Sequence, residues 1–291
     1  MDENKQRMLI ALAHPDDESF GMAGTIVRYT QQGAEVYLIC ATNGDVGSTD
    51  QHFLEGHESI SSLRLQELAC AAEVLGLTRL ITFGYRDSGM SGSTENKHEK
   101  CLVMAPLDEV TCRITEVIRE VRPQVVVTFD PYGGYGHPDH IRMYEATTAA
   151  FQAAADPERY SEQIQRGLTP YQAQKLYFMT FDRRLLKLWI VLMPIWGEDP
   201  EHIGRNKDVN LKEIAAHSYP IHAHIDTRPY AKIAEEASKC HASQLGGWGK
   251  PGLLDRVRMA LEPKDDTYMR AVPPANGRTR ERDLFEGVKL D

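Results

Sequence analysis

Residues 8–18 have the sequence MLIALAHPDDE, in which a short apolar run leads directly into a cluster of histidine and carboxylate side chains. A continuous apolar run of this length is typical of a parallel strand that is covered on both faces. A second stretch has the same design, because QVVVTF at residues 124–129 predicts a strand and GYGHPDH follows at residues 134–140. These two strands and the polar clusters behind them are the centre of the predicted fold.

The pattern around these two stretches alternates between strand-like and helix-like segments. Each strand-like run is followed by a segment whose apolar residues recur at helical spacing. Such alternation predicts an α/β fold of the Rossmann-like, doubly wound kind, with a mostly parallel sheet and helices on both faces. The predicted helices span residues 20–32, 58–75, 104–121 and 141–155, and the other predicted strands span residues 35–41, 79–83 and 176–180.

The predicted strand order brings the two polar clusters together. In the common order three-two-one-four-five, the strands that begin at residues 8 and 124 are neighbours and flank the point where the strand order reverses. Ligands of such sheets bind beyond the carboxyl ends of the strands at this point. Because both clusters follow carboxyl ends, we expect motifs that are distant in sequence to form one site.

The C-terminal part of the chain has a weaker pattern. Residues 185–196 are strongly apolar, but Pro194 and the short length favour a buried helix or a lid over a membrane segment. The other predicted elements are a strand over residues 222–226, a helix over residues 229–244 and an irregular wrap over residues 263–291. We expect one domain over residues 1–291, with a core at 1–155 that holds both motifs and a less regular elaboration at 156–291.

The composition limits the partners of the protein. The chain has 291 residues, a formal net charge of −9 and no sustained basic stripe, which argues against a nucleic-acid partner. No apolar run reaches the roughly 18 residues of a membrane helix, so we expect a cytoplasmic protein without a membrane span. A homo-oligomer is among the states that the sequence allows. The five cysteines form no CxxC pair, and Cys40 and Cys70 lie in apolar patterns that predict reduced core residues.

His14, Asp17 and His140 offer two imidazoles and one carboxylate. Three such ligands suit a catalytic zinc ion, because they leave a fourth position open for water. A residue before proline avoids the helical region, so the chain turns sharply at His14 and presents Asp17 to the same pocket. Pro138 suits the first position of a helix, which places His137 at the cap and His140 in the first turn. We predict a zinc site, and the same ligands also accept iron or cobalt.

The residues beside these ligands are candidates for proton transfer. Asp16 is predicted to be the general base that takes the proton from an activated water. A cationic His137 is predicted to stabilise the oxyanion or to protonate the leaving amine, with Asp139 orienting its ring. The alternative for Asp139 is a carboxylate that only stabilises a helix N-terminus. One such motif often merely caps a helix, but two motifs on neighbouring strands favour a catalytic metal site.

AHPDDE at residues 13–18 and GYGHPDH at residues 134–140 together resemble the motifs of the LmbE-like family, also called the PIG-L deacetylases. The resemblance is strongest over roughly the first 155 residues. It implies a zinc hydrolase that removes the acetyl group from N-acetylglucosamine bound to another group. It also implies the same zinc ligands, with Asp16 as general base and His137 as electrostatic catalyst or acid.

The resemblance adds three candidates. Arg64 matches an arginine that contacts the sugar, and its alternative is a surface residue paired with Glu67 or Glu73. Asp87, just past a predicted strand, matches an acidic residue that binds sugar hydroxyls. Tyr135 matches a mobile tyrosine that can reach the oxyanion, and its alternative is simple packing over the loop.

Other segments match the family less well. HASQ at residues 241–244 resembles the end of a family helix that borders the site, where a structural His241 is favoured over a catalytic one because the sequence shows no third partner. Residues 91–101 and 185–196 do not align with the family. These two segments are expected to line the distal end of the substrate.

The sequence therefore predicts a metal-dependent deacetylase of an N-acetylglucosaminyl conjugate, in which the sugar is joined to inositol or a related group. The first alternative is an amidase that acts on thiol S-conjugates. The second alternative is a metal-stabilised carbohydrate-binding module without turnover. Asp16 and His137 argue against the second alternative, because pure binding requires neither of them.

Overall fold

The computed structural model of the chain describes residues 5–204, 207–245 and 265–290, and its centre is one mixed sheet. The sheet has seven strands in the order β3-β2-β1-β4-β5-β7-β6. The strand pairs are parallel except for those of β7, which runs antiparallel to β5 and β6. The strands are β1 (Arg7–Leu12), β2 (Glu35–Thr42), β3 (Arg79–Tyr85), β4 (Val125–Phe129), β5 (Lys175–Thr180), β6 (Ala223–Asp226) and β7 (Asp265–Val272).

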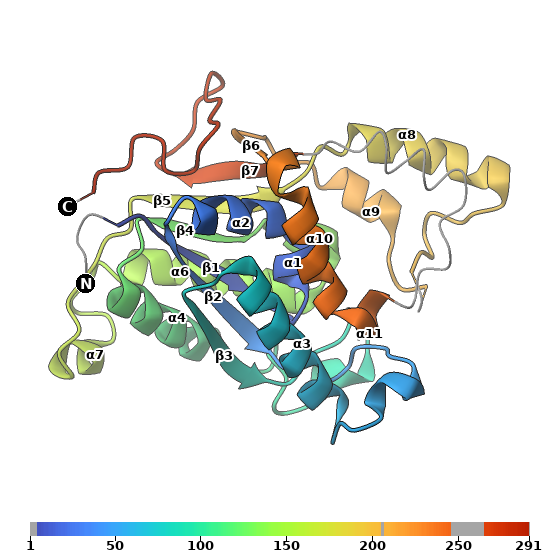
Figure 1. Cartoon of the computed structure of the whole chain (residues 1–291), viewed down its shortest axis with the longest axis horizontal. Coiled ribbons are helices and arrows are strands. Elements are labelled where there is room, and N and C mark those ends of the chain that lie inside the picture. Colours follow the sequence, from blue (N-terminus) through green and yellow to red (C-terminus); the bar gives the residue numbers. More distant parts are fainter. Residues whose placement is uncertain (1–4, 205–206, 246–264, 291) are drawn as a thin grey trace.

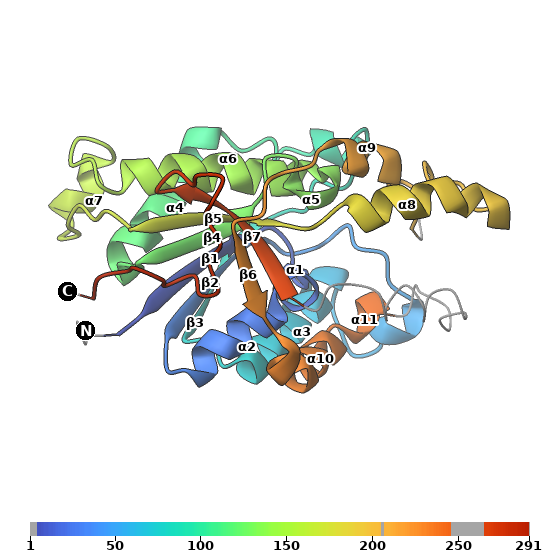
Figure 2. The ribbon, with the colours of Figure 1, turned by 90° about the horizontal axis from the view of Figure 1, so that it is seen from above.

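Helices cover both faces of the sheet, which confirms the predicted doubly wound α/β fold (Figures 1 and 2). α2, α3 and α10 pack together on one face, and α4 packs against α6 on the other. The α-helices are α1 (Asp17–Gly21), α2 (Ala23–Gln31), α3 (Ile60–Leu75), α4 (Leu107–Val121), α5 (Gly133–Gly136), α6 (Pro138–Ala153), α7 (Ser161–Gln165), α8 (Arg184–Leu192), α9 (Leu211–Ala216), α10 (Ala231–Cys240) and α11 (Ala242–Leu245). The short 3₁₀ helices are η1 (Gln51–Leu54), η2 (Thr94–Lys97), η3 (Met193–Trp196) and η4 (Arg228–Tyr230).

The two central strands are apolar because both of their faces are covered. Every residue of β1 and of β4 is buried. Burying one valine, leucine or isoleucine side chain contributes about 1.5–3 kcal/mol, so this pair contributes much of the stability of the core. Met8 pairs with Val125 and Ile10 with Val127, and the strands run in the same direction. The chain segments that follow β1 and β4 therefore leave the sheet at the same edge.

Two predicted helix ends are confirmed and one helix is divided. His137 is the N-cap of α6, with Pro138 at the first helical positions, and α3 ends at Gly76 in the left-handed conformation. The helix predicted over residues 20–32 begins earlier, at Asp17, and is interrupted at Met22, where φ is −158°. The break allows α1 to follow the turn after β1 and α2 to lie along the sheet.

The C-terminal part is more regular than predicted. The prediction of an irregular wrap is wrong for residues 265–272, which form β7 between β5 and β6. Tyr268 is its one fully buried residue and the others are half-buried, so this strand lacks the apolar run that marks β1 and β4. Residues 273–290 hold no helix or strand beyond an isolated bridge at Glu281. Residues 263, 264 and 291 of the predicted wrap lie outside the described ranges.

The apolar segment 185–196 forms α8 and η3, which project from the body of the protein beside α9 (Figure 1). No residue of α8 is buried, and Leu188 and Val191 are 55% and 71% exposed. The predicted buried helix is therefore wrong, because α8 contacts α9 but the described part of the chain buries none of its residues. The lid stays a prediction. Among the described residues, no helix combines the length and apolar character needed to cross a membrane.

The prediction of a reduced core cysteine holds for Cys40 and is wrong for Cys70. Cys40 is buried and free, whereas Cys70 lies on the exposed side of α3 and forms a disulfide with Cys240 at the end of α10. The two residues are 170 positions apart in sequence. The pattern around Cys70 could not reveal this partner, because α10 reaches α3 only through the tertiary fold.

The disulfide predicts a defined thiol count. In protein that is purified without reductant, unfolded in denaturant and alkylated, we expect three labelled cysteines, and five after reduction. Mass spectrometry of a digest should show the Cys70 and Cys240 peptides joined before reduction. Five labelled cysteines without reductant would show that this pair is not formed.

Candidate metal centre and active site

The two histidine motifs meet in space beyond the carboxyl ends of β1 and β4. The ring centroid of His14 lies 4.4 Å from that of His137 and 5.1 Å from that of His140. All three histidines are buried. The turn after β1 carries His14, the N-cap of α6 is His137, and the first turn of α6 carries His140. The site therefore lies where the strand order reverses, between β1 and β4.

Side-chain atoms of His14, Asp17 and His140 converge on one point. His14 Nδ1 lies 3.0 Å from His140 Nε2. Asp17 Oδ1 lies 3.2 Å from His140 Nε2, and Asp17 Oδ2 lies 3.6 Å from His14 Nδ1. Tetrahedral zinc bonds of about 2.0–2.1 Å place neighbouring ligand atoms about 3.3 Å apart. The three predicted ligands therefore have the spacing of a metal site.

The other nitrogen of each histidine ring already has an acceptor. His140 Nδ1 lies 3.1 Å from the carbonyl oxygen of Gly133, and His14 Nε2 lies 3.2 Å from Asp139 Oδ2. With the ring protons on these outer nitrogens, His14 Nδ1 and His140 Nε2 each keep a lone pair that a cation between them would accept. A shared proton or a cation accounts for the close approach of the two nitrogens. The donor set therefore fits a metal ion.

The Asp17 carboxylate is held ready to act as an anionic ligand. Its Oδ2 accepts the backbone N–H groups of His14 at 2.7 Å and Ala13 at 3.2 Å. Burial opposes ionisation, but His140 and His14 outweigh it and hold the pKa of Asp17 well below its usual value. Asp17 is therefore ionised at neutral pH.

The Asp139 carboxylate contacts a different histidine from the one predicted. It is completely buried and accepts hydrogen bonds from the backbone N–H of Ser88, at 2.9 Å, and from the Ser88 hydroxyl. Its Oδ2 faces His14, whereas the backbone N–H of Asp139 donates to His137 Nδ1 at 3.2 Å. The predicted orientation of His137 is thus provided by the main chain. The carboxylate instead fixes the tautomer of a metal-ligand candidate.

His137 presents Nε2 to the site as a neutral donor. Because Nδ1 accepts the Asp139 N–H, the ring proton lies on Nε2, which is 3.9 Å from Asp87 Oδ1. Burial, together with His14 and His140, lowers the pKa of His137 well below its usual value. This direction disfavours the cationic ring that the sequence predicts.

Asp87 lies on the opposite side of His14 from Asp17. Its Oδ1 is 3.5 Å from His14 Nε2 and accepts the backbone N–H of Gly89 at 2.8 Å. Burial would raise the pKa of Asp87, but His14 and His137 outweigh it and lower the pKa below its usual value. Asp87 is thus an anion at the wall of the site, and its contact with a sugar stays a prediction.

The cluster also contains overlapping sets of ligand atoms. His14, His137 and His140 form one set, and His14, Asp87, His137 and Asp139 form another, each with atoms within 4.8 Å of one another. The second set lies on the Nε2 side of His14, where Asp139 already accepts the ring proton. The Nδ1 side, with Asp17 and His140, is therefore the better metal position.

Asp16 has an unusual backbone conformation beside this centre. Its φ is 123° and its ψ is −23°, a combination that costs a non-glycine residue on the order of 1–3 kcal/mol. Its Oδ2 accepts a hydrogen bond from Arg64 Nη2 at 2.9 Å. Burial raises the pKa of Asp16 to about 6, against the opposing effect of Arg64. A carboxylate with this pKa is suited to accept a proton near neutral pH.

Arg64 is buried, so the surface alternative is wrong. Besides Asp16, it donates to the carbonyl oxygens of Pro15 at 2.5 Å and Gly44 at 3.0 Å. A Cβ atom at Gly44 would lie 2.3 Å from Arg64 Nη1, so a side chain there would displace the guanidinium from this position. Glu67 does not take this arginine, because its carboxylate accepts hydrogen bonds from Ser243. The sugar contact of Arg64 stays a prediction.

Tyr135 lies on a glycine-rich loop whose base is fixed. Asp130 Oδ1 accepts the backbone N–H groups of Tyr132 and Gly134, and Arg183 donates to Asp130 Oδ2 and to the Gly134 carbonyl, both at 3.1 Å. The Tyr135 ring lies 4.9 Å from that of His140, yet the residue is 37% exposed. This position borders the metal-ligand cluster and is open to solvent. The reach of Tyr135 to an oxyanion stays a prediction.

Sequence reasoning missed two contacts of the site. Ser88 follows Asp87 directly, but the sequence gives no sign that it would bind Asp139. Glu18 lies within the first motif, and its Oε1 is 2.7 Å from His241 Nε2. Burial lowers the pKa of His241 and the Glu18 carboxylate raises it, with a net rise. The favoured structural role of His241 thus has a partner, which only the fold reveals.

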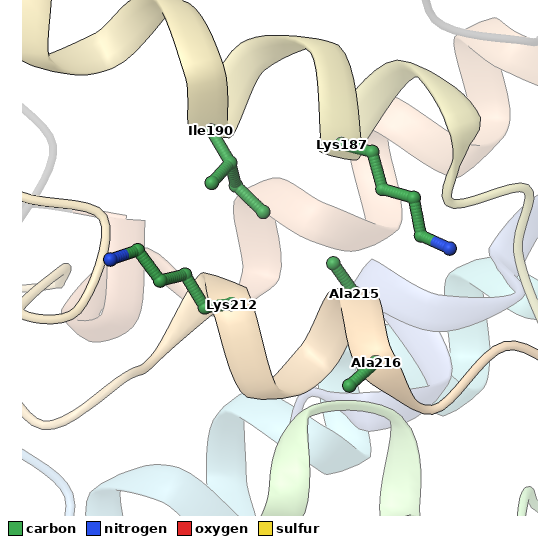
Figure 3. A pocket seen from close by; sticks show the side chains of 5 residues that line it. All are labelled: Lys187, Ile190, Lys212, Ala215 and Ala216. Carbon is green, nitrogen blue, oxygen red and sulfur yellow. The ribbon is translucent and has the colours of Figure 1, made fainter.

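A separate cavity lies between α8 and α9 and contains none of the candidate site residues. Its volume is about 280 Å³, and it is lined by Lys187 and Ile190 of α8 and by Lys212, Ala215 and Ala216 of α9 (Figure 3). It is wide open and has no cluster of convergent polar groups. The candidate site is therefore defined by its converging side chains and not by the size of a pocket.

The fold and the site define a Rossmann-like α/β protein with a metal-ligand cluster and an adjacent buried carboxylate at the switch point. A family model described as PIG-L: GlcNAc-PI de-N-acetylase matches residues 9–151. The 1D-myo-inositol 2-acetamido-2-deoxy-alpha-D-glucopyranoside deacetylase of Streptomyces avermitilis is 33% identical over an alignment of 295 positions, which covers 97% of each chain. The protein of the same name from Thermobifida fusca is 35% identical over 254 residues, which cover 83% of this chain and 84% of that one. The chain belongs to the PIG-L family.

Solved structures share the fold at low sequence identity. The N,N'-diacetylchitobiose deacetylase from Pyrococcus horikoshii has a TM-score of 0.64 and 21% identity over 92% of this chain and 84% of its own. GalB, the 4-carboxy-2-hydroxymuconate hydratase from Pseudomonas putida, has a TM-score of 0.58 and 16% identity over 93% of this chain and 98% of its own. A deacetylase and a hydratase thus share this fold, so the reaction must be argued from the site.

The ligand geometry predicts which histidine the metal requires. His140→Ala should lose bound zinc, because it removes one of the three converging ligand atoms. His137→Ala, the matched control in the same helical turn, should keep about one zinc per chain. Metal content after dialysis, measured by inductively coupled plasma mass spectrometry, checks this. Equal loss of zinc in both variants would instead support a metal held by His14, His137 and His140.

Proposed function

We propose that the protein is a metal-dependent hydrolase that removes the acetyl group from N-acetylglucosamine linked to inositol. The observation that carries this proposal is the convergence of His14, Asp17 and His140 next to the buried carboxylate of Asp16. The 1D-myo-inositol 2-acetamido-2-deoxy-alpha-D-glucopyranoside deacetylase of Streptomyces avermitilis matches 97% of this chain, so the match extends beyond the residues that form the site. The substrate that we propose is therefore 1D-myo-inositol 2-acetamido-2-deoxy-α-D-glucopyranoside.

Zinc is the metal that we propose for the site. Two imidazole nitrogens and one carboxylate at tetrahedral spacing are a ligand set that zinc favours, and iron or cobalt fits the same donors. When bound, zinc supplies Lewis-acid activation of a water molecule and of the amide carbonyl. His14 and His140 would hold it through Nδ1 and Nε2, and Asp17 through its carboxylate.

The residues around the ligands divide the proton transfers between them. Asp16 takes the proton of the attacking water, since its raised pKa and its place beside Asp17 suit a general base. His137 donates from Nε2, first as a hydrogen bond to the oxyanion that develops on the amide carbon. Asp16, now protonated, or His137 can return a proton to the leaving amine. The products are acetate and the free amine of the glucosaminyl conjugate.

Three side chains at the edge of the site are proposed to bind the substrate. The carboxylate of Asp87 accepts hydrogen bonds from sugar hydroxyls, and Tyr135 donates to the oxyanion when its loop closes. Arg64 contributes a contact to the sugar, although in the structure its guanidinium bonds Asp16 and two carbonyl oxygens. The segments at residues 91–101 and 185–196 are proposed to face the inositol end.

The amidase of thiol S-conjugates is the rival activity, and a substrate panel separates the two. Turnover of a bulky S-conjugate amide with none of the N-acetyl sugar would replace the proposed reaction by that one. The cytoplasmic location, the homo-oligomer and the single domain stay predictions.

Asp16→Asn tests the general base. Its amide keeps the size of the side chain but cannot accept a proton, so we expect kcat to fall by about 10²–10⁴-fold with the zinc content unchanged. The measurement is acetate release from the inositol conjugate by the zinc-loaded variant, with wild-type protein stripped by a chelator as the second reference. Activity at the wild-type rate in Asp16→Asn would remove this residue from the base role.

The pKa of Asp16 also predicts the pH profile. Its value of about 6 lies above the ordinary 3.8, and the base works only when deprotonated, so kcat/KM should fall as the pH is lowered through about 6. A cation bound nearby stabilises the ionised form of Asp16 and so lowers its pKa. The fall of kcat/KM towards acid pH should therefore be centred at or below about pH 6. Rates measured across a range in which the protein stays folded check this, and an acid limb well above pH 6 would contradict it.

A further inference from the structure

The conformation of Asp16 requires support from outside its own turn. Its φ of 123° lies in the region that favours glycine, so a non-glycine residue remains there only when neighbouring contacts hold it. One contact is the Arg64 guanidinium, which bonds the Asp16 carboxylate and the Pro15 carbonyl. A second contact holds the backbone, because the N–H of Asp16 donates to Glu18 Oε2 at 3.1 Å.

The Glu18 carboxylate is itself fixed by a residue from the far end of the chain. Glu18 is 1% exposed, and Oε1 accepts the Ser19 hydroxyl at 2.6 Å and His241 Nε2 at 2.7 Å. His241 is completely buried and lies 223 positions away in sequence. One oxygen of the Glu18 carboxylate accepts the Asp16 N–H, and the other accepts His241 Nε2. The position of His241 therefore sets the orientation of the Glu18 carboxylate, which in turn holds the Asp16 backbone.

The segment that carries His241 is attached to the same helix as Arg64. The preceding residue, Cys240, is joined by a disulfide to Cys70 of α3. Two residues after His241, Ser243 donates to Glu67 of α3 from its backbone N–H at 2.8 Å and from its hydroxyl at 2.7 Å. α3 therefore holds Asp16 in two ways, directly through Arg64 and indirectly through the segment of residues 240–243.

We propose that His241 is a positioning residue, which keeps the general base Asp16 in its strained, productive conformation through the Glu18 carboxylate. His241 touches neither the proposed metal ligands nor the reacting atoms. It acts by fixing Glu18, whose other oxygen holds the Asp16 backbone. This inference rests on the proposed deacetylase function, because it assigns a role to the base of that reaction.

The matched variants His241→Gln and His241→Asn test the proposal. The glutamine amide reaches the place of the imidazole Nε2 and can still donate to Glu18, whereas the asparagine amide reaches only the place of Nδ1. A displacement of about 1 Å at a catalytic group can cost about 10²-fold in rate. We therefore expect kcat to fall by about 10–100-fold in His241→Asn, with KM within about twofold of wild type, and to remain near wild type in His241→Gln.

Controls separate this role from a structural one. Lys239→Ala, on the exposed side of α10, should leave kcat unchanged. Zinc content should equal that of wild type in every variant. If His241 only stabilised the fold, the two variants would share a lowered unfolding temperature and keep the wild-type kcat when folded, and that result would overturn the proposal.

A second measurement needs no turnover. Crystal structures of the two variants should show the positive φ of Asp16 retained in His241→Gln and relaxed in His241→Asn. An unchanged Asp16 in both variants would also overturn the proposal. If wild-type protein releases no acetate from any substrate of the panel, the proposed function fails while the crystal structures still decide whether His241 positions Asp16.

Discussion

The structure of the site depends on one close approach, in which His14 Nδ1 and His140 Nε2 lie 3.0 Å apart. Each ring is fixed from behind, His14 by the Asp139 carboxylate and His140 by the Gly133 carbonyl. Asp17 adds a charged oxygen to the same point. A cation satisfies all three groups together, and the parallel pair β1 and β4 brings them to one edge of the sheet.

Hydrogen bonds from neighbouring residues hold the side chains of this site in place. Ser88 holds Asp139, which holds His14, so a serine just past β3 helps to set the direction of a proposed metal ligand. On the other side, α3 and the segment of residues 240–243 fix the turn that carries Asp16. The C-terminal part of the chain, which the sequence predicts to be an elaboration, thus takes part in holding Asp16, the proposed base. It does so through buried hydrogen bonds, whose loss costs more than that of exposed ones.

The sequence predicts the features that depend on local pattern. The apolar runs predict β1 to β5, Pro138 predicts the start of α6, and the strand order predicts that His14 and His140 meet. It does not predict contacts that arise only from tertiary packing, such as the disulfide of Cys70 and the pairing of Glu18 with His241. The sequence does not predict β7, because only Tyr268 is fully buried in it. It predicts a buried helix at α8 wrongly, because apolar residues can also lie on a projecting helix. The sequence pairs Asp139 with His137 of the same motif, whereas its carboxylate contacts His14 of the other motif.

The proposed metal position is on the Nδ1 side of His14, between Asp17 and His140. The most direct measurement is the anomalous diffraction of a zinc-loaded crystal at the zinc absorption edge. We expect one peak about 2.0–2.1 Å from His14 Nδ1 and His140 Nε2, and about 2.0–2.2 Å from an Asp17 oxygen. A peak on the Nε2 side of His14, bound by Asp87, His137 and Asp139, would contradict it.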